Sequence, residues 1–304
     1  MEKEVYINTM LDNKPRYLSF IDIAYEVSKR LPDYSSKFSN RIFTQRQLIT
    51  LYLLKQKSKL SYDEFVDDFK TRDSAIEDLQ LKRIPSPSTI KMFVKRVDCK
   101  IFEEMIVDCI QLTRKRNLET AVDGTGFQLE DGSYSYLKRL GLSTKKRKNM
   151  KFSGCAETSK HLFLSVKIRK KNRHDNVDFK PLIKKAKMGL GRTNKRIIIN
   201  TGDKAYDCEE NHEFAEENGF EHIAPLRAKT KQYHRIQGKH RKKLFKKFPK
   251  KKYHRRSIIE SMFFRVKRLC GNVVRAKKWM MQKKEMLGKI LAYNIHRLVQ
   301  LIRV

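Results

Sequence analysis

Hydrophobic positions in the first 115 residues recur at the spacing of amphipathic helices. The stretch TQRQLITLYLLKQKS carries apolar residues three and four apart, and it opens with Thr44 and Gln47, the two residues of a helix capping box. The stretch SYDEFVDDFK repeats this arrangement, and SPSTIKMFVKRV offers Ser86 as a cap with proline at the first helical position. The sequence therefore predicts an all-helical N-terminal region.

Two interpretations of this helical region stay open. Short helices joined by turns are typical of a helix-turn-helix motif, which would turn Ser88, Lys91 and Lys95 toward DNA. A plain helical bundle is the alternative, because basic helix faces are common in a chain of this composition.

Beyond residue 116 the pattern changes to short runs of β-branched and aromatic residues. LETAVDGTGFQL and KHLFLSVKIRK are typical of strands, and KRIIIN is typical of a strand buried on both faces. Between the last two, DNVDFKPLIKKAKMGLG has a helical pattern that ends at a glycine. The order strand, helix, strand predicts an α/β layer with a partly parallel sheet. We therefore expect a helical region at 1–115 and an α/β domain at 116–304.

The charge of the chain indicates which class of partner it binds. With 69 basic and 34 acidic residues, the formal net charge is +35, and a compact chain of that charge repels itself unless a polyanion accompanies it. Nucleic acid is the first candidate. No apolar run approaches the roughly 20 residues of a membrane-spanning helix, and the N-terminus has no secretory h-region, so we expect a soluble cytoplasmic protein. The five cysteines contain no C-x-x-C pair, which argues against a zinc site or a disulfide framework.

Two aspartates stand where functional groups collect in an open α/β sheet, just past the carboxyl ends of parallel strands. Asp123 ends the apolar run TAV, and Asp203 follows IIIN after a short Thr-Gly turn. If the two strands are parallel neighbours, both side chains lie at the same edge of the sheet. Either aspartate alone is also typical of a turn or a helix cap, so the prediction depends on the pair.

A third carboxylate, Glu260, follows a basic stretch. From Arg227 to Arg256 there are fifteen Lys and Arg residues and no Asp or Glu. A helix from Tyr253 to Cys270 would collect its apolar residues on one face and Tyr253, Arg256, Glu260 and Lys267 on the other. The alternative is a solvated amphipathic helix in which Glu260 only pairs with Arg256.

Three carboxylates brought together repel one another and raise each other's pKa unless a cation lies among them. All-oxygen ligands suit Mg²⁺ or Mn²⁺, and two such ions can assist phosphodiester cleavage.

Asp175 and Glu157 are weaker candidates for this site. At Asp175 a helix cap is favoured over a fourth metal-site role, and at Glu157 an exposed charge at a strand end is favoured.

Three motifs, AVDGTGF, NTGDKAYD and YHRRSIIESMFFRVK, resemble the catalytic motifs of the DDE transposases of bacterial and archaeal insertion sequences, in the group numbered four and five. The third motif is the most specific, because that group carries tyrosine, arginine, glutamate and lysine at fixed intervals. Tyr253, Arg256, Glu260 and Lys267 fit every interval, and the resemblance spans roughly residues 44 to 300.

The resemblance implies a ribonuclease H-like catalytic domain, a mixed sheet flanked by helices, after an all-helical N-terminal DNA-binding region. It implies that Asp123, Asp203 and Glu260 are catalytic and bind two Mg²⁺ or Mn²⁺ ions. A metal-activated water would nick DNA at the transposon end, and the freed 3′-hydroxyl would attack target DNA. Double-stranded DNA is the expected partner, with a homodimer holding two ends together in the prokaryotic cytoplasm, at the nucleoid.

The resemblance and the composition each indicate residues that bind DNA. By resemblance, Tyr253, Arg256 and Lys267 contact the terminal DNA or position the acid. Two acid-free basic segments, 132–156 and 227–256, could hold the phosphate backbone. The candidates outside the third motif are Lys91, Lys95, Lys145, Lys146, Arg147 and Lys148.

Two other functions stay open from the sequence. A nuclease of the same fold that hydrolyses DNA without joining strands would share all three acids. A non-catalytic DNA-binding protein derived from a transposase would keep the basic surface and would not need them.

Overall fold

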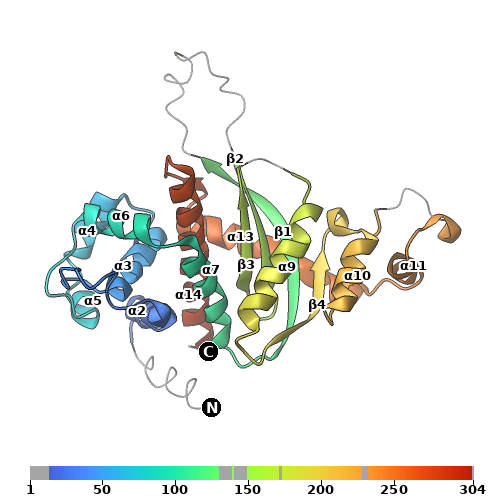
Figure 1. Ribbon diagram of the computed structural model, residues 1–304, viewed down its shortest axis with the longest axis horizontal. Coiled ribbons are helices and arrows are strands. Elements are labelled where there is room, and N and C mark those ends of the chain that lie inside the picture. The colour runs from blue at the N-terminus through green and yellow to red at the C-terminus, as the bar shows by residue number, and fades with distance from the viewer. Residues whose placement is uncertain (1–13, 130–138, 140–148, 171–172, 228–231, 303–304) are drawn as a thin grey trace. The chain divides into compact units, whose positions relative to one another are not determined.

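The computed structural model describes residues 14–129, 139, 149–170, 173–227 and 232–302 (Figure 1). The chain divides into two compact units, Met1–Thr113 together with Val266–Val304, and Arg114–Arg265. The C-terminal helix therefore packs with the N-terminal helices, although its residues belong to the expected α/β domain. The expected division into a helical DNA-binding region at 1–115 and a catalytic domain at 116–304 stays a prediction.

The described part of the first unit is almost entirely helical, as the sequence predicts. Its elements are α2 (Arg16–Val27), η1 (Ser28–Arg30), α3 (Gln45–Ser58), α4 (Tyr62–Phe69), α5 (Asp73–Asp78), α6 (Pro87–Arg96), α7 (Cys99–Gln111), the short strand β6 (Val273–Val274) and α14 (Trp279–Ile302).

Local capping sets where these helices begin. The Thr44 hydroxyl accepts from Gln47 N–H (3.2 Å), and the Gln47 side chain accepts from Thr44 N–H (2.8 Å). Ser61 and Glu64 form the same reciprocal pair at the start of α4. Ser86 caps α6, with proline at the first helical position. All three predicted helix starts are confirmed, because a cap is made by residues within one turn of each other.

Helix α14 forms the centre of this unit and packs against α7, α3 and α2. The Tyr52 hydroxyl donates to the Lys284 carbonyl (3.0 Å), and the buried Lys284 ammonium donates to the Val94 carbonyl (3.0 Å). Gly288 allows the close approach of α3, because a Cβ there would lie 2.6 Å from Tyr52 Cε1. The core of the first unit is thus tied together by polar contacts as well as by apolar burial.

The second unit is an α/β layer. Its elements are β1 (Asn117–Leu129), β2 (Asn149–Glu157), β3 (Leu162–Arg169), α9 (Asn176–Leu190), β4 (Arg196–Gly202), η2 (Lys204–Tyr206), α10 (Glu209–Glu217), β5 (Glu221–Ile223), η3 (Tyr233–Arg235), α11 (Lys239–Lys246), α12 (Lys250–Tyr253), η4 (His254–Arg256) and α13 (Ser257–Cys270) as far as Arg265.

The sheet of this unit is mixed, with strand order β3-β2-β1-β4-β5. Strands β1, β2 and β3 are antiparallel neighbours, whereas β4 pairs parallel to β1 and β5 pairs parallel to β4. The parallel pair β1 and β4 is the one predicted from the two aspartate motifs. Strand β4 ends at Gly202, opposite Val122, whereas β1 continues to Leu129. Asp123 therefore lies in the middle of β1, paired with Gly154 of β2, and not past the end of its strand as the sequence suggests.

A bulge interrupts the pairing of β1 with β4. Leu118 pairs with Ile197 but Glu119 pairs with Ile199, which leaves Ile198 as an extra residue. Ile197 is buried, while Ile198 and Ile199 are half-buried. The prediction that this strand is buried on both faces therefore holds only in part, because the bulge breaks the alternation of its side chains.

Helices cover both faces of the sheet. On β2, the Phe152 ring packs edge-on against Phe263 of α13 (5.7 Å between centroids), and the Ser153 hydroxyl donates to Asp178 of α9 (2.8 Å). Successive side chains of a strand point to opposite faces, so α13 and α9 lie on opposite sides of β2, as Figure 1 shows. The mixed sheet flanked by helices after a helical N-terminal region is confirmed.

The helix predicted over Tyr253–Cys270 is interrupted. Residues Lys250–Tyr253 form a single α turn, His254–Arg256 form a 3₁₀ turn, and α13 begins only at Ser257. Such tightened turns are common at helix ends. Five Lys and Arg residues between Lys250 and Arg256 also oppose the helix dipole at this N-terminus.

Within the described part of the chain, no helix is both long and apolar enough to span a bilayer.

Candidate active site

The parallel pairing of β1 and β4 places two aspartates at one sheet edge. Val122 lies opposite Gly202 in register, so Asp123 and Asp203 are the next residues on each strand path. The Asp203 carboxylate turns back to accept from Ala205 N–H (2.8 Å) and caps the 3₁₀ turn that follows. Gly202 is needed there because a Cβ would lie 3.0 Å from the Tyr206 ring.

Ion pairs hold the turn before α13 against the same strands. Arg255 pairs with Glu119 of β1, and Lys252 pairs with Glu221 of β5 (2.7 Å). Both pairs are partly exposed, so each stabilises the fold by only about 0–1 kcal/mol. Their effect is to fix the position of the 3₁₀ turn, which contacts β1 and β4, and with it the first residues of α13.

Arg256 connects two of the three carboxylates. Its Nη1 lies 2.7 Å from Glu260 Oε1 and 3.4 Å from Asp123 Oδ2. The Asp123 side chain is 15% exposed and that of Glu260 is 53% exposed, so Glu260 retains contact with solvent. One guanidinium therefore stands between carboxylates that come from a strand and a helix far apart in the sequence.

Burial raises the pKa of Asp123 to about 6. The Gly124 N–H, which donates to Asp123 Oδ1 (2.7 Å), and the Arg256 guanidinium oppose this shift, while the charges of Asp203 and Glu260 add to it. The neighbouring groups therefore stabilise ionised Asp123 by less than burial destabilises it. A further cation at this edge would relieve that deficit.

Tyr206 is a residue of this site that sequence reasoning missed. Its side chain is fully buried, and its hydroxyl has no hydrogen-bond partner among the described residues. Burial raises its pKa well above the usual range, and the charges of Asp175, Asp123 and Asp203 add to the shift. Its place in the motif NTGDKAYD, three residues after Asp203, was the available signal.

Asp175 stands at the N-cap position of α9, as the sequence favours, but its side chain makes no cap bond. Its carboxylate pairs with Lys151, and a Cβ on Gly124 would lie 3.0 Å from its Oδ1. Glu157 is fully buried rather than exposed, and accepts from Ser159 N–H (3.0 Å) in the turn after β2. The ion pair of Asp175 with Lys151 is a tertiary contact that the local pattern does not reveal, whereas the hydrogen bonds of Glu157 are made within its own turn.

The donor chemistry of the three acids suits a hard divalent cation, but their arrangement is not that of a formed metal site. Carboxylate oxygens are the preferred ligands of Mg²⁺. Among the residues that the structure describes, no three His, Cys, Asp or Glu side chains are close enough to share an ion. Arg256 contacts both Asp123 and Glu260, so the charge that a metal would supply is provided in part by the protein.

The other predicted DNA-binding residues lie on several elements. Tyr253 is half-buried and packs against Phe248 (5.2 Å between centroids), and burial raises its pKa. Lys267 is on α13, seven residues after Glu260, and Lys91 and Lys95 are exposed on α6. The four basic residues of the other predicted cluster lie outside the described residues: Lys145, Lys146, Arg147 and Lys148.

A family profile described as the transposase DDE domain matches residues 115–295, a range that includes Asp123, Asp203 and Glu260. The chain belongs to this family, which confirms the resemblance seen in the three motifs and the ribonuclease H-like fold class. It is a transposase by family, a protein of DNA transposition. No curated protein matches the chain.

Among solved structures, a cryo-EM structure of the piggyBac transposase synaptic complex with hairpin DNA is similar to the chain. It shares 11% sequence identity, with a TM-score of 0.46, over 99% of this chain and 76% of the other.

Proposed function

We propose that this protein is a metal-dependent transposase that cuts DNA at the ends of an insertion sequence and joins the freed ends to target DNA. The observation that supports this most is the meeting of motif residues from β1, from the end of β4 and from α13 at one sheet edge, with Arg256 in contact with two of the acids. In this proposal residues 116–304 carry the chemistry, and the helical region 1–115 binds DNA.

Asp123, Asp203 and Glu260 are the residues that would hold the cations. Two bound Mg²⁺ or Mn²⁺ ions would supply activation of the attacking oxygen and stabilisation of the leaving oxygen in a phosphodiester displacement. The raised pKa of Asp123 favours this role, because a carboxylate short of positive charge gains most from a divalent partner.

Arg256 has a second task in this proposal. Once cations neutralise Asp123 and Glu260, its guanidinium is free to contact a phosphate of the terminal DNA, a geometry that arginine suits as a planar donor. Tyr253 and Lys267 would contact the same DNA. The exposed lysines of α11 and α12, including Lys243, Lys246 and Lys250, would follow the backbone further along.

The helical N-terminal region would contribute phosphate contacts through Lys91 and Lys95 of α6. The basic residues at 145–148 are proposed as further contacts on the basis of sequence alone. Because transposition brings two ends together, a homodimer on DNA in the cytoplasm is the expected assembly. Analytical ultracentrifugation with and without end DNA measures this directly.

Two experiments separate the proposal from its alternatives. Incubation with labelled end DNA, a plasmid target and Mg²⁺ should give joined products, whereas a nuclease of the same fold gives cut ends only. Asp123→Asn should then abolish cleavage and keep DNA binding. The matched control is Asp67→Asn, at an exposed position of α4. Wild-type protein that neither cuts nor joins under any divalent ion would leave the non-catalytic DNA-binding function.

A further inference from the structure

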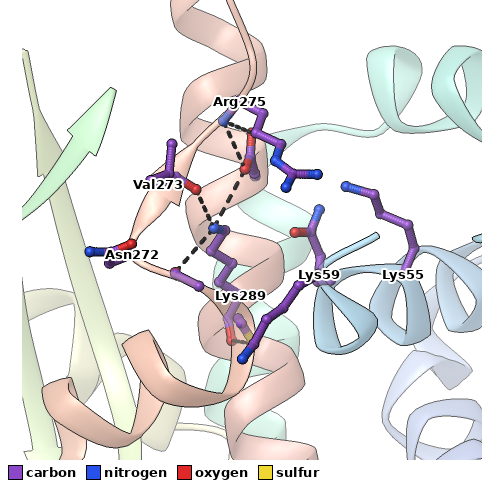
Figure 2. Close-up of a pocket in the computed structure, with 10 residues that line it drawn as sticks. Lys55, Lys59, Asn272, Val273, Arg275 and Lys289 are labelled. Carbon is purple, nitrogen blue, oxygen red and sulfur yellow. Dashed lines mark hydrogen bonds and ion pairs between the residues drawn. The ribbon is translucent and has the colours of Figure 1, made fainter. Parts of the chain in front are cut away.

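A cavity in the first unit is lined by more cationic than anionic side chains. It has a volume of about 170 Å³ and is lined by the end of α3, the segment around β6 and the first half of α14. Figure 2 shows Lys55 and Lys59 extending from α3 and Arg275 and Lys289 from the other side. Four of the residues that line it are cationic, Lys55, Lys59, Arg275 and Lys289, and one, Glu285, is anionic.

The single carboxylate of the cavity is already engaged. Glu285 accepts from Arg275 N–H (3.1 Å to each oxygen) and from Ala276 N–H (2.9 Å). Lys289 Nζ lies 3.6 Å from the same carboxylate and donates to the carbonyls of Val273 (2.6 Å) and Gly271 (3.2 Å). Glu285 and Lys289 together hold the turn around β6, so the carboxylate is not available to the remaining cations.

Lys55 is the most buried cation of the cavity after Lys289, with 7% of its surface exposed. No carboxylate among the described residues forms an ion pair with its ammonium. Its Nζ lies 4.7 Å from the centre of the Tyr62 ring, which also carries Lys91 at 5.3 Å. Figure 2 shows the Lys55 side chain directed toward the Arg275 guanidinium, a like charge. A buried lysine that faces arginine is unfavourable unless an anion lies between them.

Burial lowers the pKa of Lys55 to about 8, with Lys289, Arg275 and Lys91 adding to the shift and Glu285 opposing it. The amine is therefore still mostly protonated at neutral pH. An anion in the cavity would meet a charged ammonium and would strengthen its protonation in turn.

We propose that this cavity binds a phosphate group between Lys55 and Arg275. A lysine ammonium and an arginine guanidinium are the side chains that proteins use for phosphate. The cavity volume is several times the roughly 30 Å³ that a water molecule takes in the liquid, so a phosphate group with bound water can enter. The phosphate comes either from a DNA backbone or from a free phosphate ion, and the chemistry that recognises it is the same.

The test uses the full-length protein and inorganic phosphate as the probe. Melting temperature is measured against potassium phosphate, with potassium chloride at matched ionic strength as the reference, for the wild type, Lys55→Met and Lys57→Met. Lys57→Met is the matched control, because the substitution removes the same charge from the same helix. The Lys57 side chain packs over Phe20 (4.8 Å) and does not line the cavity. A second variant, Arg275→Gln, removes the exposed partner and leaves the core of the helix packing intact.

The expected result is a melting-temperature rise specific to phosphate in the wild type and in Lys57→Met. It should be lost in Lys55→Met and reduced in Arg275→Gln, with phosphate affinity about tenfold weaker when one charged contact is removed. An equal phosphate response in all four proteins would overturn the proposal, because it would show that the general positive charge is responsible.

Binding of a random-sequence DNA duplex identifies the source of the phosphate. If Lys55→Met weakens this binding and lowers the slope of log K against log salt by about one relative to Lys57→Met, the group is a DNA phosphate. If DNA binding is unchanged while the phosphate response is lost, the ligand is a free phosphate ion. The inference does not rest on the proposed catalysis, since Asp123→Asn should keep the full phosphate response.

Discussion

The acidic edge of the second unit and the cationic cavity of the first unit are opposite versions of one arrangement. At the edge, three carboxylates share one arginine in direct contact with two of them, and burial raises the pKa of Asp123. In the cavity, four cations surround one carboxylate, and burial lowers the pKa of Lys55. In each region, burial disfavours the ionised form of the side chains that gather there.

These two regions show how a binding site differs from ordinary surface in a chain that carries charge nearly everywhere. A net charge of +35 makes most lysines uninformative, because solvent screens them. What distinguishes these two regions is burial together with a charge imbalance that the described side chains correct only in part. The first calls for a divalent cation and the second for a phosphate, which are the two charged components of a metal-dependent reaction on DNA.

The largest effect is expected from Asp203→Asn. Asparagine keeps an oxygen that can accept from Ala205 N–H, so the turn after β4 is preserved while the charge is lost. Cleavage of end DNA should fall by about a thousandfold, the equivalent of roughly 4 kcal/mol of transition-state stabilisation. Gel-based cleavage rates measure this, and unchanged rates would remove the acidic edge from the chemistry.

Lys55→Met tests the cost of the unpaired charge without any ligand. At neutral pH the variant should be more stable than the wild type, by at most on the order of 3 kcal/mol for a pKa shift from 10.5 to about 8. The unfolded chain binds the proton up to the higher pKa, so wild-type stability rises as pH increases from 8 to 10.5.

In Lys55→Met this rise should be absent. The charged groups that act on the amine are Glu285, Lys289, Arg275 and Lys91. Urea unfolding at pH 7 and at pH 9.5 measures the difference between the two proteins. A rise of equal size in both would show that another group titrates.

Glu285→Gln removes the only carboxylate among the described residues that line the cavity. Stability should fall by about 1–2 kcal/mol, because glutamine replaces a charged acceptor of two backbone N–H groups. The phosphate-dependent rise in melting temperature should become larger, because the cavity gains one unit of positive charge. A smaller rise would mean that Glu285 organises the site more than it opposes the anion.

The smallest effect is expected from Arg256→Gln. Glu260 is half exposed, so the loss of its ion pair should lower stability by about 1 kcal/mol or less in the absence of metal. The stabilisation by Mn²⁺ should grow, because no guanidinium competes for Asp123 and Glu260. Melting temperatures with and without Mn²⁺ measure both changes, and a reduced metal response would contradict the competition.

Much of the fold and of the acidic edge could be predicted because the signals are local. The capping residues Thr44, Ser61 and Ser86 act within one turn, and the apolar face of α13 follows from spacing: Ile259, Met262 and Phe263 are buried, while Phe264 is 65% exposed. The two aspartates could be paired because their strands are parallel neighbours, although β1 continues past Asp123 to Leu129.

The remaining features depend on contacts between distant residues. The sequence allows Glu260 to pair with Arg256, but it does not show that Asp123 comes to the same guanidinium. Lys55 follows leucines in an amphipathic helix and resembles any solvated lysine until α14 and the segment around β6 close over it. For Tyr206 the sequence offers only its place in the motif NTGDKAYD, and the structure adds that its hydroxyl is buried near the acids.

The extra residue Ile198 in β4 has a consequence for how this chain tolerates change. Four residues lie between Ile198 and Asp203, and the pairing of the strand with β1 advances by one position at the bulge before it reaches that aspartate. Deletion of Ile198 would leave Ile197 opposite Leu118 and Ile199 opposite Glu119 in a regular ladder, so the aspartate would keep its place. Deletion of a residue between Ile198 and Asp203 would instead draw the aspartate back by one place and turn it to the opposite face. A deletion is therefore tolerated at the bulge itself and is far more damaging just after it.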